Sequence, residues 1–273
     1  FAQLEHGDYR AMVLGGHGGM GKSTLLAHHV ERQREAGDVV LFYRASTLAD
    51  ADLSGRILRD LGVRGMFFED FLATADDVFQ DGVRLRIVVD AVNEHPSDAA
   101  ELVRSIDSLV RQAETFPWLR LVTSIRTTAY ERLPSDARFG RAERTKYLLV
   151  ERQQGEASVR SPIVEVPPFG AGDIAEVYER YRSYRRPDPD EPDGEGTYVF
   201  RPRTSFDELD PHGSTCAMMR NPLMMRLLVA AFHRQELPSQ VSFDEAMKLY
   251  MDHVVVEQNN PSGAHPQRRK LLY

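Results

Sequence analysis

Short apolar runs alternate with helically spaced segments in the first half of the chain. Four runs of five to seven residues are almost continuously apolar, and polar segments with helical spacing separate them. Strands that are apolar on both faces are typical of a parallel sheet covered by helices on each side. The runs predict strands at Tyr9–Leu14, Val39–Tyr43, Leu85–Asp90 and Leu119–Ile125. Helices are predicted at Lys22–Glu35, Ala49–Leu61, Glu69–Phe79 and Asp98–Thr115, the last with Ser97 as its N-cap.

The pattern changes after Arg126. Two further strands are predicted before Pro167-Pro168 interrupts the chain, and helical spacing dominates beyond that point. We therefore predict an α/β domain over residues 1–170 and an all-helical domain over 171–273. The elements expected here are strands at Lys146–Arg152 and Ile163–Val166, a helix at Asp173–Tyr184, a Pro-, Asp- and Gly-rich loop at Arg185–Gly196, an apolar segment at Met218–His233, and a helix at Phe243–Gln258 that opens with a capping box of Ser242 and Glu245.

Composition excludes several classes of protein. The chain has 34 Lys and Arg against 41 Asp and Glu, a formal net charge of −7. Sequence-independent coating of nucleic acid needs a basic surface, so we do not expect nucleic acid as a partner of this module. Cys216 is the only cysteine, which excludes a disulfide framework and sites built from several cysteines. No apolar run approaches the ~18 residues of a spanning helix, and we expect no membrane partner.

The two ends of the sequence indicate a piece of a longer protein. The chain begins at Phe1 without an apolar leader, and its last residues have the character of a helix that is cut short. A single thiol also fits a reducing compartment. We therefore expect a cytoplasmic protein with more chain on both sides of this segment.

The most specific motif follows the first predicted strand. Residues 16–24 are Gly-His-Gly-Gly-Met-Gly-Lys-Ser-Thr and match G-x-x-x-x-G-K-[ST], the phosphate loop. Its glycines let consecutive backbone N–H groups surround phosphate oxygens, and the next helix directs its positive end at the same anion. We expect Lys22 to reach the β- and γ-phosphates, Ser23 to bind Mg²⁺ and Thr24 to meet the α-phosphate. The predicted nucleotide-binding residues are Gly16, Gly18, Gly19, Gly21, Lys22, Ser23 and Thr24.

Two acids lie at and just beyond the end of the third predicted strand. Asp90 ends that strand, at the carboxyl edge where open α/β sheets bind ligands, and we expect it to hold Mg²⁺ through a water molecule. Glu94 lies on the loop that follows and is placed to polarise the attacking water, because phosphoryl transfer depends mainly on positioning and charge. The plainer interpretations are an acidic strand-end cap for Asp90 and a solvated loop acid for Glu94.

Two further segments are less specific. Arg126 follows the fourth predicted strand and is placed to contact the γ-phosphate during hydrolysis; in a chain so rich in arginine, a surface arginine is the plainer interpretation. Asn221-Pro222-Leu223 precedes an apolar segment. Since proline suits the first turn of a helix, this segment alone predicts only a helix start.

Together these segments resemble the NACHT-type branch of the STAND nucleotidases, signal-transducing P-loop ATPases related to the AAA+ proteins. The loop Gly16–Ser23 matches the GxGGxGKS/T pattern of that family. Asp90 and Glu94 keep the ends of its D-G-x-D-E motif, but Ala91 replaces the glycine and Asn93 the second aspartate. The resemblance covers nearly the whole chain.

Two other family motifs are also recognisable. The family's sensor strand ends in T-S-R, and here Ile125 separates Thr123-Ser124 from Arg126, which leaves the register of the arginine open. Asn221-Pro222-Leu223 is similar to the family's N/T-P-L motif, whose proline packs near adenine. The resemblance therefore implies that Pro222 lies near the base.

The resemblance implies a nucleotide-controlled switch. It implies ATP or ADP and Mg²⁺ as cofactors, bound between the two domains, with Glu94, Asp90 and Arg126 as the catalytic residues. It also implies slow hydrolysis, nucleotide-dependent assembly with copies of the same chain, and effector and sensor domains on its flanks; bacterial members commonly serve in antiviral defence. Two alternatives stay open: a nucleotide-locked scaffold with little turnover, which Asn93 favours, and an AAA+ loader that acts on DNA.

Overall fold

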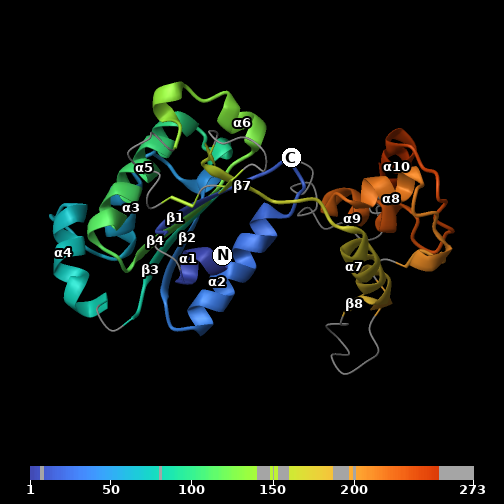
Figure 1. Cartoon of the computed structure of the whole chain (residues 1–273), viewed down its shortest axis with the longest axis horizontal. Helices are drawn as coiled ribbons and strands as arrows, with labels where there is room; N and C mark the ends of the chain where they lie inside the picture. The colour runs from blue at the N-terminus through green and yellow to red at the C-terminus, as the bar shows by residue number, and fades with distance from the viewer. Residues whose placement is uncertain are drawn as a thin grey trace, which may run out of the picture. The chain divides into compact units, whose positions relative to one another are not determined.

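The computed structural model describes residues 1–6, 9–79, 82–139, 148–149, 151–152, 160–186, 197–198 and 201–251. The chain divides into two compact units, Phe1–Pro167 and Pro168–Tyr273, whose elements are labelled in Figure 1.

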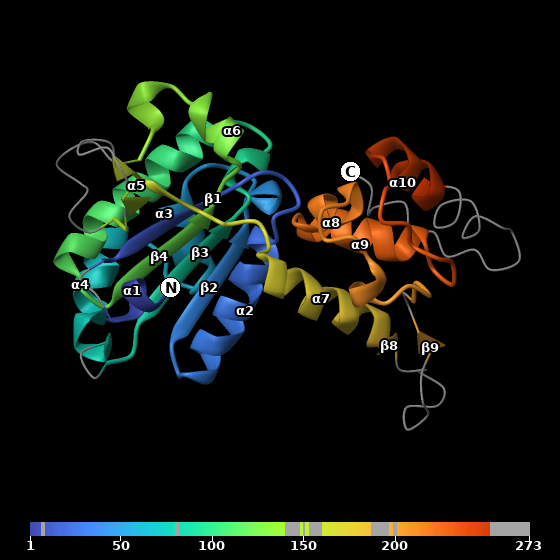
Figure 2. The same ribbon diagram turned by 45° about the vertical axis from the view of Figure 1, so that its right-hand side comes forward.

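A five-stranded parallel sheet forms the centre of the first unit (Figures 1 and 2). Its order is β2-β3-β4-β1-β7, and every neighbouring pair is parallel. The parallel α/β sheet expected from the apolar runs is confirmed. The strands are β1 (Ala11–Gly15), β2 (Val39–Arg44), β3 (Leu85–Asp90), β4 (Leu119–Ser124) and β7 (Ile163–Glu165). A separate antiparallel pair consists of β5 (Glu151–Arg152) and β6 (Arg160–Ser161).

Helices cover both faces of this sheet. α1 and α2 contribute to one buried apolar cluster, and α3, α4, α5 and α6 contribute to another on the opposite face. The helices are α1 (Ala2–His6), α2 (Lys22–Glu35), α3 (Leu53–Asp60), α4 (Phe68–Phe79), α5 (Ala99–Thr115) and α6 (Thr127–Glu131), with short 3₁₀ turns η1 (Ala45–Thr47), η2 (Val92–Glu94) and η3 (Ser135–Ala137).

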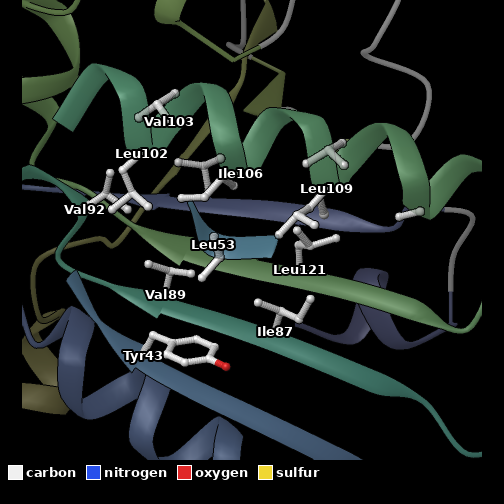
Figure 3. Packing of buried hydrophobic residues seen from close by; sticks show 14 of the residues in the cluster. Tyr43, Leu53, Ile87, Val89, Val92, Leu102, Val103, Ile106, Leu109 and Leu121 are labelled. Atoms are coloured by element: carbon white, nitrogen blue, oxygen red, sulfur yellow. The ribbon is translucent and has the colours of Figure 1, made fainter. Parts of the chain in front are cut away.

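Alternate residues of each strand enter opposite clusters. In β1, Val13 lies in the cluster beneath α5, whereas Leu14 lies in the cluster beneath α2. Figure 3 shows Ile106 and Leu109 of α5 lying over the sheet. All four side chains are at most 3% exposed, and burial of an aliphatic side chain of this size stabilises a fold by about 1.5–3 kcal/mol. The sheet is therefore a rigid platform for the loops that follow its strands.

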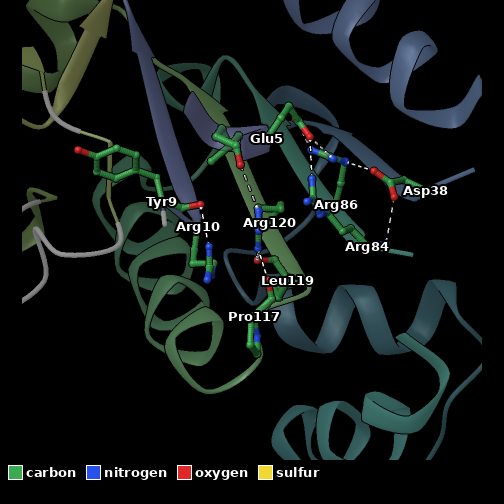
Figure 4. Close-up of polar contacts among 10 residues, drawn as sticks. Glu5, Tyr9, Arg10, Asp38, Arg84, Arg86, Pro117, Leu119 and Arg120 are labelled. Carbon is green, nitrogen blue, oxygen red and sulfur yellow. Dashed lines mark hydrogen bonds and ion pairs between the residues drawn. The ribbon is translucent and has the colours of Figure 1, made fainter. Parts of the chain in front are cut away.

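Charged side chains are buried near the amino ends of two central strands. Arg86 of β3 and Arg120 of β4 are register partners and are 1% and 4% exposed. The carboxylate of Glu5, from α1, accepts from Arg86 Nη1 at 2.6 Å and from Arg84 Nη1 at 2.9 Å (Figure 4). Asp38 pairs with Arg86 from the other side. These five residues form the amino-edge cluster.

Main-chain carbonyls complete this cluster. Arg120 donates to the carbonyl oxygens of Leu4 at 3.4 Å and Leu119 at 3.1 Å. Burial, and after it the neighbouring arginines, lower the pKa of Arg120 to about 10. Because Leu4 also lies in α1, this short helix supplies both a carboxylate and a carbonyl to adjacent arginines, and it is fastened to the sheet by polar contacts.

The second unit has an apolar cluster of its own. Tyr178 and Met225 are completely buried in it, and the Tyr178 hydroxyl donates to the Thr204 carbonyl at 2.8 Å. Apart from one antiparallel pair of two-residue strands, its described elements are helical. They are α7 (Ala171–Ser183), β8 (Arg185–Arg186), β9 (Thr197–Tyr198), η4 (Phe206–Glu208), α8 (Ser214–Met219), α9 (Pro222–Ala231) and α10 (Phe243–Tyr250).

Two predicted helix starts are wrong because other side chains cap the helices. Asp98, not Ser97, caps α5, since its carboxylate accepts from the Ala100 N–H at 2.7 Å. The helix expected from Ala49 begins only at Leu53, because Asp52 accepts from the N–H three residues on, at 2.9 Å. Ser242 does cap α10, accepting from the Glu245 N–H at 3.2 Å.

Other predicted elements are divided or only partly described. The apolar segment 218–233 is split into α8 and α9, because Asn221 caps a new helix at Pro222. Arg185 and Arg186 belong to β8 rather than to a loop, and residues 187–196 lie outside the described part. Residues 146, 147 and 150 of one predicted strand and residues 252–258 of the last predicted helix lie outside it as well.

Within the described ranges, no helix is both long enough and apolar enough to cross a membrane.

Candidate nucleotide site

The glycine-rich loop joins β1 to α2 at the carboxyl edge of the sheet. Gly16, Gly19 and Gly21 have φ angles of +134°, +79° and +81°, a region that glycine enters without the steric cost of a Cβ. A Cβ at Gly18 would meet nothing within 4 Å. The backbone conformations therefore explain the glycines at positions 16, 19 and 21, whereas neither the conformation nor the space requires a glycine at position 18.

The amino end of α2 is open toward this loop. Its N-cap, Gly21, provides no side-chain hydrogen bond, and its first turn contains no acidic residue. The first N–H groups of a helix carry partial positive charge and are a common binding place for anions. Ser23 and Thr24 lie in the same turn and are exposed. This end of α2 therefore fits a phosphate group.

Lys22 lies across the loop. Its ammonium group donates to the carbonyl oxygens of Gly16 and His17, both at 2.8 Å. Burial is the largest influence on the pKa of Lys22 and lowers it; Arg126 lowers it further, while Glu165, Asp90 and Glu94 raise it. These charged groups come from four different segments, so the structure gathers them around the lysine.

Asp90 ends β3 and is held by the neighbouring strand. It is 5% exposed, and its Oδ1 accepts from the Ser124 hydroxyl at 2.6 Å. The same hydroxyl oxygen accepts from the Ala91 N–H at 2.8 Å. Ser124 thus fixes both the carboxylate and the start of the loop that leads to Glu94.

Ala91 turns the chain sharply after β3. Its φ and ψ angles are 56° and 51°, a left-handed conformation that costs a residue with a Cβ roughly 1–2 kcal/mol. This turn leads into η2, in which the Glu94 N–H donates to the Ala91 carbonyl at 2.8 Å. The glycine of the resembled motif would meet the same turn without strain, which gives a physical reason for a glycine at this position.

Arg126 is bound to the acidic loop. Its guanidinium donates to Glu94 Oε1 at 3.1 Å, and its main-chain N–H donates to Asn93 Oδ1 at 2.9 Å. The Arg126 and Glu94 side chains are 52% and 46% exposed. Ile125, the additional residue before it, is completely buried, and its N–H bonds to the Leu14 carbonyl. The inserted isoleucine is thus accommodated in the core, and the arginine lies at Glu94.

Two residues that the sequence did not single out also contact the loop. Thr127 Oγ1 accepts from the Gly16 N–H at 2.8 Å and donates to Glu165 Oε1 at 2.6 Å. Glu165 ends β7, beside β1. The sequence did place Glu165, a polar residue, near the carboxyl end of a predicted strand. That this strand lies beside β1, and so beside the glycine-rich loop, follows only from the strand order.

Pro222 belongs to the second unit. It occupies the first turn of α9, where Asn221 accepts from the N–H groups of Leu223 at 2.9 Å and Met224 at 3.3 Å. The geometry accounts for this segment as a helix start; its packing near a base stays a prediction.

The oxygen donors present suit Mg²⁺ bound together with phosphate. Magnesium usually takes one or two carboxylates plus substrate phosphates, and the Ser23 hydroxyl and the Asp90 carboxylate are donors of that kind. Among the described residues, no group of three or more His, Cys, Asp or Glu side chains gathers as a metal site.

The parallel sheet, the glycine loop after β1 and the helix that follows it give this chain the α/β fold of the P-loop nucleoside triphosphatases. No protein-family model matches the chain, and no curated protein matches it.

Several solved structures resemble the chain at low identity. One is the ORC2 protein of Aeropyrum pernix, with ADPNP and ADP: identity 17%, TM-score 0.44, covering 97% of this chain and 65% of that one. Another is a Walker-type ATPase of Pyrococcus abyssi: identity 12%, TM-score 0.49, covering 92% and 68%. A third is Cdc6p from Pyrobaculum aerophilum: identity 15%, TM-score 0.41, covering 64% and 44%. The match thus extends over less than half of Cdc6p and about two thirds of the other two proteins, and likeness at this level says nothing about activity.

Proposed function

We propose that this chain is an ATP-binding module that hydrolyses ATP slowly with Mg²⁺. The observation that carries the proposal is the position of Lys22, across a glycine loop and surrounded by Asp90, Glu94 and Arg126. A half-buried ammonium at the amino end of an uncapped helix suits a bound polyphosphate.

Each polar group then has a distinct part in binding and turnover. Lys22 exchanges its carbonyl partners for phosphate oxygens. Ser23 and, through a water molecule, Asp90 would hold Mg²⁺, which would neutralise phosphate charge. The bond from Ser124 keeps the Asp90 carboxylate in place. Glu94 orients and polarises the water that attacks the γ-phosphate. Arg126 is close enough to Glu94 to exchange that partner for the γ-phosphate.

We also propose that nucleotide state controls assembly with copies of the same chain, as in a bacterial defence protein of the NACHT type. The combined motifs at Gly16–Ser23, Asp90–Glu94, Arg126 and Asn221–Leu223 support this part. Measurement of molar mass in solution with ATP–Mg²⁺, with ADP and without nucleotide tests it. A mass that is the same in all three conditions would contradict it.

A second candidate is a nucleotide-locked scaffold with little turnover. The ion pair between Arg126 and Glu94, at 3.1 Å, favours it. A carboxylate that remains bonded to a guanidinium is not free to orient the attacking water.

One variant separates the two candidates. In the slow ATPase, Arg126→Ala removes a contact to the γ-phosphate and lowers single-turnover hydrolysis. In the scaffold, the same change frees Glu94 and raises hydrolysis. The unchanged chain must bind ATP–Mg²⁺ in calorimetry and Lys22→Ala must not; if both bind equally, the nucleotide site itself is refuted.

A further inference from the structure

One peptide at the entrance of the phosphate loop is fixed from both of its sides. The Gly16 N–H donates to Thr127 Oγ1 at 2.8 Å, and the Gly15 carbonyl accepts from the Val166 N–H at 3.1 Å. Thr127 opens α6 and Val166 follows β7. Two segments distant in sequence therefore hold the Gly15–Gly16 peptide.

Glu165 determines the direction of these hydrogen bonds. The Thr127 hydroxyl has a single proton, which it donates to Glu165 Oε1 at 2.6 Å. Its oxygen is then left to accept from the Gly16 N–H. Because an ionised carboxylate only accepts, the chain of bonds runs one way, from Gly16 to Thr127 to Glu165.

The space around Gly15 shows how closely β7 approaches the loop. A Cβ at Gly15 would lie 2.0 Å from Ile163 Cγ2, 3.1 Å from Glu165 Oε1 and 3.2 Å from Thr127 Oγ1. The main chain at Gly15 therefore has no room to shift toward β7. Gly16 itself is buried, with a φ of +134°, so the hydrogen bonds of its N–H and of the Gly15 carbonyl set its orientation.

We propose that Thr127 and Glu165 are positioning residues that orient the Gly15–Gly16 peptide and so preset the phosphate loop. The peptide after it carries the Gly16 carbonyl, which accepts from Lys22 Nζ at 2.8 Å. The orientation of the Gly15–Gly16 peptide therefore also affects the position of the carbonyl to which Lys22 bonds. The inference rests on the proposed function for its effect on ATP, whereas the hydrogen bonds themselves belong to the free protein.

The proposal distinguishes the hydrogen bonds from the charge of Glu165. Thr127→Val leaves the Gly16 N–H without an acceptor, and we expect the Kd for ATP–Mg²⁺ to rise about tenfold, because a loop that is no longer preset must be ordered when ATP binds. Thr127→Ser keeps the hydroxyl and should stay within about twofold of the unchanged chain. The turnover rate of bound ATP should change little in both, because Asp90 and Glu94 are untouched.

Variants of Glu165 extend the same test. Glu165→Leu removes the acceptor for the threonine proton, so the hydroxyl oxygen that accepts from the Gly16 N–H is no longer held in one orientation; the variant should change the Kd in the same direction as Thr127→Val, by a smaller factor. Glu165→Gln keeps an acceptor and removes a negative charge beside the loop, so it should bind ATP at least as tightly as the unchanged chain. Thr128→Val, at an exposed neighbouring position, is the matched control and should change nothing.

The experiment combines amide exchange of the nucleotide-free protein with calorimetric titration of ATP–Mg²⁺. We expect the Gly16 amide to exchange about tenfold faster in Thr127→Val, faster by a smaller factor in Glu165→Leu, and at the unchanged rate in Thr127→Ser and Thr128→Val. Since Glu165 is exposed, its variants keep the test usable if Thr127→Val does not fold.

The outcomes separate this inference from the proposed function. If the unchanged chain binds ATP and Thr127→Val and Glu165→Leu bind it equally well, the inference is overturned and the proposed function stands. If the unchanged chain binds no ATP, the proposed function fails, and Gly16 exchange alone decides whether Thr127 and Glu165 orient the loop: faster exchange supports it, and unchanged exchange overturns it.

Discussion

The amino and carboxyl ends of the same strands form two edges of the parallel sheet, and both edges carry polar and charged side chains. The two sets of side chains differ in burial and in how they are paired. β3 has Arg86 near its amino end and Asp90 at its carboxyl end, and β4 has Arg120 and Ser124 in the corresponding places. At the amino edge, Arg86 is 1% exposed and paired with two carboxylates. At the carboxyl edge, the Arg126–Glu94 pair is about half exposed, and the hydrogen bonds that Lys22 makes to described residues go to main-chain carbonyls.

The difference lies in how completely the charges are satisfied. In a buried ion pair with additional hydrogen bonds, the charged groups already have their partners, so the pair fixes one arrangement of the chain. An exposed pair contributes little to stability and separates easily when a competing ligand arrives. The amino edge is thus a structural cluster, and the carboxyl edge keeps its charges available for the polyphosphate that we propose binds there.

The largest expected effect tests whether the carboxyl edge performs chemistry. Glu94→Gln keeps the size of the side chain but loses the charge that polarises water, so single-turnover hydrolysis should fall by roughly 10²–10⁴-fold while ATP affinity persists. Glu101→Gln, an exposed acid on α5, should leave the rate unchanged. Near-normal hydrolysis in Glu94→Gln would transfer the catalytic role elsewhere and favour the scaffold.

The next effect tests the amino edge as a structural element. Glu5→Ala leaves Arg84 without this carboxylate and Arg86 with Asp38 alone, so the free energy of unfolding should fall by about 3 kcal/mol, as when one partner of a buried pair is removed. Denaturant titration measures it. Glu31→Ala, whose side chain is 71% exposed, should change stability by no more than about 0.5 kcal/mol. Equal effects in the two variants would remove the distinction between the edges.

Lys22→Ala sharpens the comparison, because it should affect binding and not the fold. ATP–Mg²⁺ at about 100 times its Kd should stabilise the unchanged chain by roughly 2.7 kcal/mol and the variant not at all. Thermal unfolding with and without ligand tests this expectation. Lys248→Ala on α10 is the control, and a normal ligand shift in Lys22→Ala would contradict the assignment of the loop.

A pH titration examines a buried base that lies away from the proposed chemistry. Burial lowers the pKa of His29 on α2 to about 4, and the Phe1 ring stacks on it with ring centroids 4.1 Å apart. A lowered pKa means that the folded chain favours the neutral imidazole, so stability is complete above the unfolded pKa of about 6.5 and declines as the pH falls toward 4.

The expected size of this effect is about 2 kcal/mol between about pH 7.5 and pH 5. Denaturant titrations at several pH values should show a shallower decline in His29→Gln than in the unchanged chain. His28→Gln alters an exposed neighbour and should keep the full decline. Parallel curves for all three proteins would refute the role of His29.

The smallest effect concerns the strained turn at the carboxyl edge. Ala91→Gly removes the Cβ from a residue with a φ of 56°, so the free energy of unfolding should rise by about 1 kcal/mol. Gly172→Ala lies in the helix α7, where a Cβ would meet nothing within 4 Å. It should also stabilise the fold, but by reducing the conformational entropy of the unfolded chain and not by relieving strain. A destabilised Ala91→Gly would show that the turn is not strained.

Local sequence signals were sufficient where each element is determined by its own residues. α2 spans Lys22–Glu35 as predicted, because a left-handed glycine ends the loop directly before it. The carboxyl-edge positions of Asp90 and Arg126 follow from the apolar runs of β3 and β4, since each run ends where polar residues begin. Their roles in catalysis stay predictions.

Contacts between distant segments could not be predicted in this way. An arginine such as Arg86 in a strand gives no sign of being buried, because its partner Glu5 lies 81 positions away. The bond from Gly16 to Thr127 depends on β1 lying next to β4 and β7. The left-handed turn at Ala91 was also not predictable, because alanine seldom adopts it.

The strand order has a consequence for the synthesis of this protein on the ribosome. β1 emerges before both of its neighbours in the sheet, β4 and β7, which are translated much later. At about 5–20 residues per second, roughly 10–30 s pass between β1 and β7. The glycine loop cannot reach its final shape during that interval, so a nascent chain that ends before Ile163 should expose an apolar strand to chaperones and bind no nucleotide.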